Sequence, residues 1–109
     1  MTLNKNRCVV TGLGMISAIG NNVEECWNNA LNSVSGIKHT TSVDTKDCYA
    51  SLAAEVDSNL DDVKVNEDMD RVSKLCIKAS REALKDAGLS DFNNDPRVSV
   101  ITVSYTHLT

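Results

Sequence analysis

The stretch Arg7-Cys-Val-Val-Thr-Gly-Leu-Gly-Met-Ile-Ser-Ala-Ile-Gly20 decides which fold the rest of the chain can adopt. It begins with an apolar, β-branched run and then places glycines at positions 12, 14 and 20. A run without apolar/polar alternation is typical of a strand buried on both faces. Glycines mark positions where a side chain has no room. We therefore predict a buried strand at Cys8–Thr11 that leads into a close-packed loop.

The composition of the 109-residue chain is that of one domain with a modest core. Apolar residues make up 41% and aromatic residues only 4%, so a core would consist of Val, Leu, Ile and Ala. A net charge of −4 without a basic cluster argues against nucleic acid and anionic membrane surfaces as partners. No segment has the apolar length of a membrane helix, and the polar start does not resemble a signal peptide. We expect a cytoplasmic protein.

Two amphipathic helices are predicted. The first, about Val23–Ser33, has Asn22 as its N-cap, and Trp27 on its apolar stripe is predicted to be a packing anchor. The second, about Glu67–Ala87, ends before Gly88, where a left-handed C-terminal cap is expected. Its small residues allow close approach of a flat partner such as a sheet; they are Ala79, Ala83 and Ala87.

The remaining segments complete an α/β pattern. The polar stretch 39–62 contains one weak edge strand, Leu52–Val56. A second buried strand is predicted at Arg97–Ile101. Strand, helices and strand in this order predict a right-handed crossover with Cys8–Thr11 and Arg97–Ile101 parallel.

The cysteines and histidines form no recognisable ligand or catalytic pattern. The four cysteines are widely spaced and include no Cys-x-x-Cys pair. We expect Cys8, Cys26 and Cys76 to be small buried apolar residues and Cys48 to be exposed. His39 is expected to be a solvated loop residue.

A nucleotide-binding βαβ module is an alternative, since Gly12-Leu13-Gly14-Met15-Ile16-Ser17 approaches the dinucleotide fingerprint. The third glycine is replaced by Ser17, and the loop continues to Gly20 before a helix can begin. Asp44 lies in a polar loop and is a poor match for the acidic residue expected after a second strand. These departures make the alternative a remote one.

Several short motifs are characteristic through their order and spacing. They are Val-Val-Thr-Gly-Leu-Gly at 9–14, Ser17-Ala18-Ile19-Gly20-Asn21, Trp27, Ser35-Gly36-Ile37, Asp44-Thr45, Ala54-Glu55-Val56, Met69-Asp70-Arg71 and Ala83-Leu84-Lys85-Asp86-Ala87-Gly88-Leu89. Together they resemble the N-terminal part of a β-ketoacyl-[acyl-carrier-protein] synthase, most closely the elongating type II condensing enzymes of fatty acid synthesis. The resemblance covers about residues 5–101.

This resemblance implies a partial thiolase-like fold, the first β-α-β portion of an N-terminal βαβαβαββ half, in an enzyme that is usually dimeric. Family members join an acyl group to a malonyl unit on a carrier protein, using one cysteine and two histidines. Neither the four cysteines nor His39 and His107 match those motifs, so no catalytic, cofactor-binding or metal-binding residue is assigned here. We expect the 109-residue chain alone to be inactive and unstable. The resemblance leaves open a polyketide ketosynthase or a non-catalytic chain-length partner.

Two segments depart from the family pattern. Family members often carry basic residues before Met-Asp that contribute to carrier-protein docking, whereas this chain has Asn66, Glu67 and Asp68. An acidic carrier protein would be repelled there. After Ile101 the expected glycine- and serine-rich segment is missing, and Ser-Tyr-Thr-His-Leu-Thr at 104–109 resembles a translated sequencing adapter. We therefore predict an N-terminal domain fragment at 1–101 and a non-native tail at 102–109.

Overall fold

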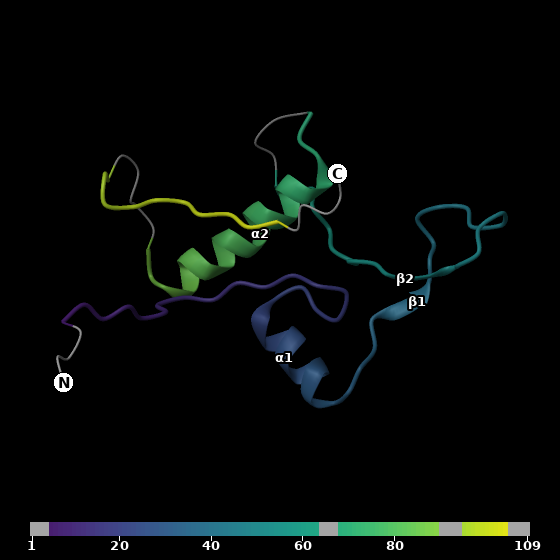
Figure 1. Ribbon diagram of the computed structural model, residues 1–109, viewed down its shortest axis with the longest axis horizontal. Coiled ribbons are helices and arrows are strands. Elements are labelled where there is room, and N and C mark those ends of the chain that lie inside the picture. Colours follow the sequence, from purple (N-terminus) through teal and green to yellow (C-terminus); the bar gives the residue numbers. More distant parts are fainter. Residues whose placement is uncertain (1–4, 64–67, 90–94, 105–109) are drawn as a thin grey trace.

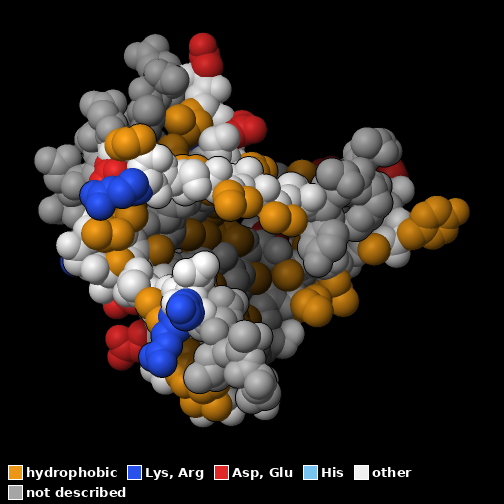
Figure 2. Space-filling view, turned by 60° about the vertical axis from the view of Figure 1, so that its left-hand side comes forward, with side chains coloured by type: hydrophobic (Ala, Val, Ile, Leu, Met, Phe, Trp, Pro, Cys, Tyr) orange, Lys and Arg blue, Asp and Glu red, His pale blue; other side chains and the backbone are white. Residues whose placement is uncertain are grey.

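The computed structural model describes residues 5–63, 68–89 and 95–104, and its elements follow the order α1, β1, β2, α2 (Figure 1). The chain is extended, with a radius of gyration of 17.9 Å, whereas a compact chain of this length has about 13 Å. Its accessible surface is 10003 Å², compared with about 5,900 Å² for a folded monomer of this mass. Much surface is therefore uncovered, and many large apolar side chains of the described residues are exposed (Figure 2).

Helix α1 spans Val23–Leu31 and begins where the sequence predicts. The Oδ1 atom of Asn22 accepts a hydrogen bond from the Glu25 amide at 2.8 Å, which confirms the N-cap. The helix ends two residues earlier than predicted, and Ser33 takes a left-handed conformation with φ 56°. Trp27 is 63% exposed, so its predicted role as a packing anchor is wrong in this structure.

Helix α2 spans Arg71–Asp86, and its first residue lies after Asp68. The predicted range placed Asp70 inside the helix, which is wrong, because Asp70 is its N-cap. Its short carboxylate caps the helix by accepting from the Ser73 amide at 3.0 Å. The predicted start at Glu67 lies outside the described residues.

The C-terminus of α2 agrees with the prediction. Gly88 has φ 72°, and its amide donates to the Lys85 carbonyl at 3.1 Å. The Leu89 amide donates to the Leu84 carbonyl at 2.9 Å. These two bonds form a Schellman cap, which satisfies carbonyls at the end of the helix.

The described sheet consists of two short antiparallel strands, β1 (Ile37–His39) and β2 (Leu52–Ala54), with Lys38 opposite Ala53. Strand β2 confirms the predicted edge strand in shortened form, whereas β1 was not predicted. The segments Cys8–Thr11 and Arg97–Ile101 were predicted as parallel strands, but neither is assigned as a strand in this structure.

Cys8–Thr11 and Arg97–Ile101 are not strands here because no described backbone hydrogen bonds join them to each other. A strand requires a neighbouring backbone with which to exchange hydrogen bonds. In Figure 1 the N-terminal segment (purple) and the C-terminal segment (yellow) run in the same direction beside α2, but no described ladder joins them. The described chain is therefore a small α/β unit whose parallel pairing stays a prediction.

Burial differs among the predicted core residues. Cys26, Leu60 and Val63 are the buried apolar residues of the described chain. Cys26 is buried and Cys48 is exposed, as predicted, but Cys8 and Cys76 are exposed, which corrects the prediction. Their segments face surface that no described element covers. None of the described helices has the length and apolar character required to span a membrane.

Candidate functional site

The first two glycines of the opening stretch lie directly against α2. A Cβ atom at Gly12 would collide with the Ala83 carbonyl oxygen and would lie 2.8 Å from the Ala87 Cβ. A Cβ atom at Gly14 would collide with the Ala79 carbonyl oxygen and would lie 2.9 Å from the Ala83 amide nitrogen. Side chains are excluded at both glycines because a backbone packs on a helix face made of alanines. The predicted close approach at Ala79, Ala83 and Ala87 is confirmed, although its partner is an extended segment and not a sheet.

Two carboxylates of α2 accept hydrogen bonds from the backbone of the glycine segment and of the helix that follows it. The Leu13 amide donates to Asp86 Oδ2 at 3.0 Å, and the Val23 amide donates to Glu82 Oε1 at 2.7 Å. Glu82 and Asp86 are four residues apart, so they lie on one face of the helix. Val23 is the first residue of α1, and its amide has no acceptor within that helix. Glu82 therefore caps α1 from outside, and α2 fixes both the glycine segment and the helix that follows it.

The turn between the glycine segment and α1 is closed by Gly20. Ser17 and Gly20 exchange two backbone hydrogen bonds of 2.9 and 3.3 Å. A Cβ atom at Gly20 would lie 2.6 Å from the Cys26 amide nitrogen. The Cys26 sulfur lies 3.1 Å from Ser17 Oγ and is enclosed by this turn. Cys26 therefore packs as a small buried residue, and an incoming thioester has no access to it.

A groove of about 640 Å³ lies between the β1–β2 hairpin and the first residue of α2. Two cations and two carboxylates line it, namely Lys38, Arg71, Glu55 and Asp57. Arg71 is already engaged, since its Nη2 donates to the Val56 carbonyl at 2.6 Å. Because the charges balance and Arg71 is occupied by backbone, the groove lacks the net charge that would select an anion or a cation.

Glu55 is the most strongly perturbed group of this groove. Its carboxylate accepts hydrogen bonds from the hydroxyls of Thr40 and Ser42, the latter at 2.6 Å, and from the hydroxyl of Thr41 at 3.3 Å. These donors stabilise the ionised form and lower the pKa of Glu55 to about 2, with the Ser42 hydroxyl as the largest cause. The carboxylate thus ties the loop after β1 to the residue after β2, which is a structural role.

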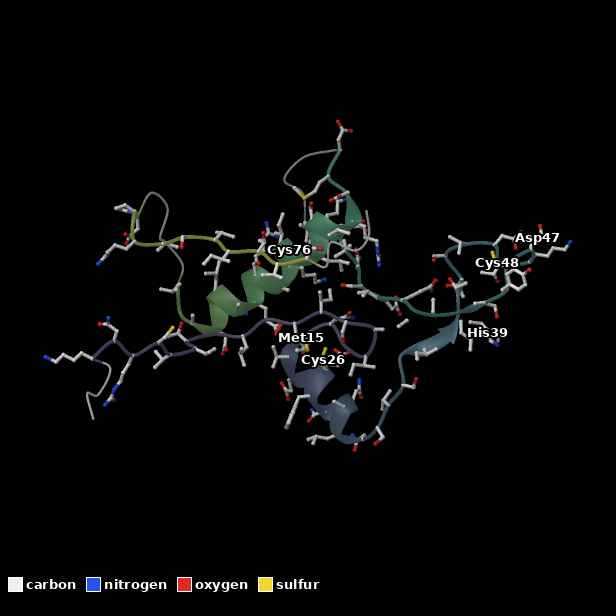
Figure 3. All side chains as sticks on the ribbon, viewed as in Figure 1. Met15, Cys26, His39, Asp47, Cys48 and Cys76 are labelled. Carbon is white, nitrogen blue, oxygen red and sulfur yellow. The ribbon has the colours of Figure 1, made fainter. Side chains whose placement is uncertain are left out.

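His39 forms no catalytic arrangement with its neighbours. Its Nδ1 lies 3.1 Å from Ser51 Oγ, and the described residues place no carboxylate in hydrogen-bond contact with the ring. Figure 3 shows His39 and Cys48 at the hairpin, well apart from Cys26 and Cys76. Within residues 5–63, 68–89 and 95–104, no cluster of three His, Cys, Asp or Glu residues could hold a metal ion.

Of the other residues singled out from the sequence, Asp68 is exposed. Asn66, Glu67 and His107 lie outside the described residues. The contacts of Glu82, Asp86 and Glu55 were not predicted from the sequence. The spacing of Glu82 and Asp86, four residues apart on the helix that carries the alanines, could have indicated that both face the same partner. The hydroxyl run Thr40-Thr41-Ser42 is a possible set of donors to a carboxylate, but its pairing with Glu55 depends on the hairpin register.

The comparisons with known proteins agree with this scaffold. The family model described as "Beta-ketoacyl synthase, N-terminal domain" matches residues 5–107. The chain belongs to this family. The match includes the glycine segment, the hairpin and α2.

The chain is also similar to curated proteins named "3-oxoacyl-[acyl-carrier-protein] synthase 2". It is 43% identical over 99 residues to the protein of Staphylococcus aureus strain N315, covering 87% of this chain and 23% of that protein. It is 35% identical over 104 residues to the protein of Coxiella burnetii strain RSA 493, covering 90% of this chain and 25% of that protein. The chain thus spans about a quarter of the length of the curated relatives it matches.

Proposed function

We propose that this chain is the N-terminal part of a 3-oxoacyl-[acyl-carrier-protein] synthase that acts in fatty acid biosynthesis. The observation that carries the proposal is the glycine segment seated on α2, in a chain that the family model matches over residues 5–107. The relatives named 3-oxoacyl-[acyl-carrier-protein] synthase 2 support this proposal.

The proposed reaction of the whole protein is a decarboxylative Claisen condensation. An acyl group is first carried as a thioester on an enzyme cysteine. Malonyl-carrier protein loses carbon dioxide, and the resulting carbanion attacks the acyl carbonyl. A carbon–carbon bond forms, the cysteine thiolate leaves, and 3-oxoacyl-carrier protein is released. We assign none of these steps to a residue of this chain, whose proposed part is to provide the scaffold.

The geometry at the start of α1 weighs against the nucleotide-binding alternative. A phosphate at a helix N-terminus needs free amides and a favourable helix dipole. Here the Val23 amide is occupied by the carboxylate of Glu82, and Asn22 caps the Glu25 amide. A pyrophosphate would meet a negative charge at this position, so the condensing-enzyme proposal is the better supported one.

Several finer features belong to the same proposal. In the longer protein we expect a thiolase-like fold in which Cys8–Thr11 and Arg97–Ile101 pair as parallel strands. We also propose a cytoplasmic homodimer that receives acyl carrier protein through a surface other than Asn66–Asp68.

The assignment of residues 102–109 as a non-native tail also stays a proposal. Sequencing the longer reading frame tests it. A glycine- and serine-rich segment directly after Ile101 would support a non-native tail, and an unchanged sequence through Thr109 would contradict it.

The direct test uses the complete reading frame that contains this chain. The purified protein is incubated with acyl-carrier protein and malonyl-carrier protein, and the products are identified by mass spectrometry. The proposal predicts a 3-oxoacyl group two carbons longer than the acyl substrate, with release of carbon dioxide. Carrier-protein binding without a condensed product would contradict an active synthase and support a non-catalytic partner.

A further inference from the structure

The single proline of the chain, Pro96, follows an aspartate, Asp95. The bond between such a pair is the peptide bond that acid cleaves most readily, for two chemical reasons. The aspartate carboxyl group can reach the carbonyl carbon of its own residue and close a small cyclic anhydride. The proline nitrogen, which belongs to a tertiary amide, takes up a proton more readily than other amide nitrogens and therefore leaves more easily. The Asp95–Pro96 bond thus carries its own nucleophile and a good leaving group.

The structure places this bond in a tight turn. The Val98 amide donates to the Asp95 carbonyl at 3.1 Å, which closes a turn over Asp95–Val98. Asp at the first position and Pro at the second are preferred residues of type I turns. The carbonyl that accepts this hydrogen bond belongs to the Asp95–Pro96 bond itself. A donor at this oxygen stabilises the negative charge that develops there when a nucleophile attacks the carbon.

The Asp95 carboxylate is held by the residue that follows the proline. Its Oδ1 atom accepts hydrogen bonds from the Arg97 amide at 2.9 Å and Arg97 Nε at 3.0 Å, and its Oδ2 atom accepts from Arg97 Nη2 at 2.8 Å. The Arg97 side chain is the largest cause that holds the pKa of Asp95 below its ordinary value of 3.8. Among the described residues, Arg97 is also the charged residue that contacts this carboxylate. While this pair persists, both carboxylate oxygens are engaged and carry no proton for the leaving nitrogen.

These contacts are local, so they do not depend on the surface that a longer chain would cover. All of them join residues within Asp95–Val98. In Figure 1 the segment that contains them (yellow) begins at the left of the molecule, away from the hairpin of β1 and β2. The Asp95 side chain is 27% exposed and that of Arg97 is 87% exposed, so water and acid reach both groups.

We propose that the Asp95–Pro96 bond is a self-cleavage site triggered by acid, with Asp95 as its nucleophile and Arg97 as the residue that restrains it. When the carboxylate is protonated, the ion pair with Arg97 is lost. A carboxyl oxygen then attacks the carbonyl carbon of Asp95, the bond to the Pro96 nitrogen breaks, and that nitrogen takes the carboxyl proton. Water opens the resulting anhydride and leaves Asp95 as a C-terminal residue with two carboxyl groups. The products are residues 1–95 and 96–109, and the step is independent of the proposed synthase activity.

The test follows the purified 109-residue chain by mass spectrometry during incubation at neutral pH and in acid near pH 3.8, the ordinary pKa of an aspartate. We expect the fragments 1–95 and 96–109 to accumulate in acid and not at neutral pH. Arg97→Ala should be cleaved roughly threefold faster in acid, the effect of losing an exposed ion pair. Arg81→Ala is the matched control, because Arg81 is an exposed arginine of α2 and the charge change is identical. Asp95→Ala should stay intact at this bond.

A second set of incubations, in urea, separates the effect of the turn from that of the sequence. Urea removes the turn, so Arg97→Ala and the unmodified chain should then be cleaved at equal rates. Equal rates without urea would overturn the proposal, because Arg97 would not restrain the bond. A faster Arg97→Ala in urea as well, or equal acceleration by Arg81→Ala, would overturn it because the effect would not come from the turn. An unmodified chain that stays intact in acid, or cleavage of Asp95→Ala at the same bond, would also contradict it.

Discussion

Two segments with a β-branched, apolar run are packed differently in this chain. The N-terminal segment, Arg7–Gly20, packs on α2 at two glycines, and its Leu13 amide is held by the carboxylate of Asp86. The Glu82 carboxylate holds the Val23 amide just beyond the segment. The C-terminal segment, Val98–Ser104, has no described partner beyond the turn at Asp95. Hydrophobicity is shared by both, so it cannot explain the difference. Instead, a segment is held in place where glycines permit close backbone contact and where side-chain oxygens accept hydrogen bonds from backbone amides.

The largest effect is expected from Gly14→Val. Its side chain would displace the backbone from the Ala79 carbonyl, so the N-terminal segment should leave α2. We expect a loss of about 3 kcal/mol, measured by amide exchange of the helix. Gly88→Ala is the control, since nothing lies within 4 Å of a Cβ atom there. That control should cost only about 1 kcal/mol, because of the left-handed backbone. Equal losses in the two variants would contradict the close-contact explanation.

A smaller effect is expected from Glu82→Ala. The change removes the acceptor of the Val23 amide and should cost about 1–2 kcal/mol, the usual value for a lost helix cap. Exchange of the amides in the first turn of α1 is the measurement. Arg81→Ala is the neighbouring control, for which the described residues show no side-chain partner. Unchanged exchange in Glu82→Ala would show that α2 does not fasten α1.

The hydrogen bonds to Glu55 at the hairpin offer a pH-dependent test of the same idea, namely that specific hydrogen-bond partners fix the position of a segment. The pKa of Glu55 falls from 4.5 to about 2 on folding, since the hydroxyls of Ser42 and Thr40 stabilise its carboxylate. The resulting stabilisation is fully present above pH 4.5 and is lost as the pH falls towards 2. Carboxyl chemical shifts measured across this range should give a low midpoint, and Ser42→Ala should raise it. A wild-type midpoint near 4.5 would contradict the arrangement.

The smallest effect is expected from Trp27→Ala. Because Trp27 is 63% exposed in this chain, the substitution should change stability by no more than about 0.5 kcal/mol. Acrylamide quenching of the unmodified protein should also show an accessible indole. Strong protection from the quencher would mean that another surface covers α1 in solution. That result would contradict the exposed position of Trp27.

Local signals in the sequence predicted the elements that depend on neighbouring residues. Asn22 and Gly88 identified one end of each helix because caps are made within a few positions of the chain. The alanines of α2 and the glycines of the opening stretch each indicated a close backbone contact, but not that they contact one another. The family resemblance was readable for the same reason, since its motifs have a fixed order and spacing.

Features that depend on distant partners were not predictable in the same way. The buried role expected for Cys8, Cys76 and Trp27 presumes covering surface that the described chain does not contain. The capping of α1 by Glu82 joins residues 59 positions apart. The capture of Glu55 by Thr40 and Ser42 requires the register of β1 and β2. Each of these contacts is set by tertiary arrangement, so the neighbouring residues in the sequence do not identify its partner.

Residue-resolved amide exchange of the dilute, monomeric chain tests the central contrast most directly. We expect protection at Leu13 and Val23, whose amides are held by the carboxylates of α2. We expect rapid exchange at Val100, Ile101 and Val103, which have no described hydrogen bonds. Equal exchange rates in the two segments, or faster exchange at Leu13 and Val23, would contradict the conclusion that α2 selectively fastens the N-terminal segment.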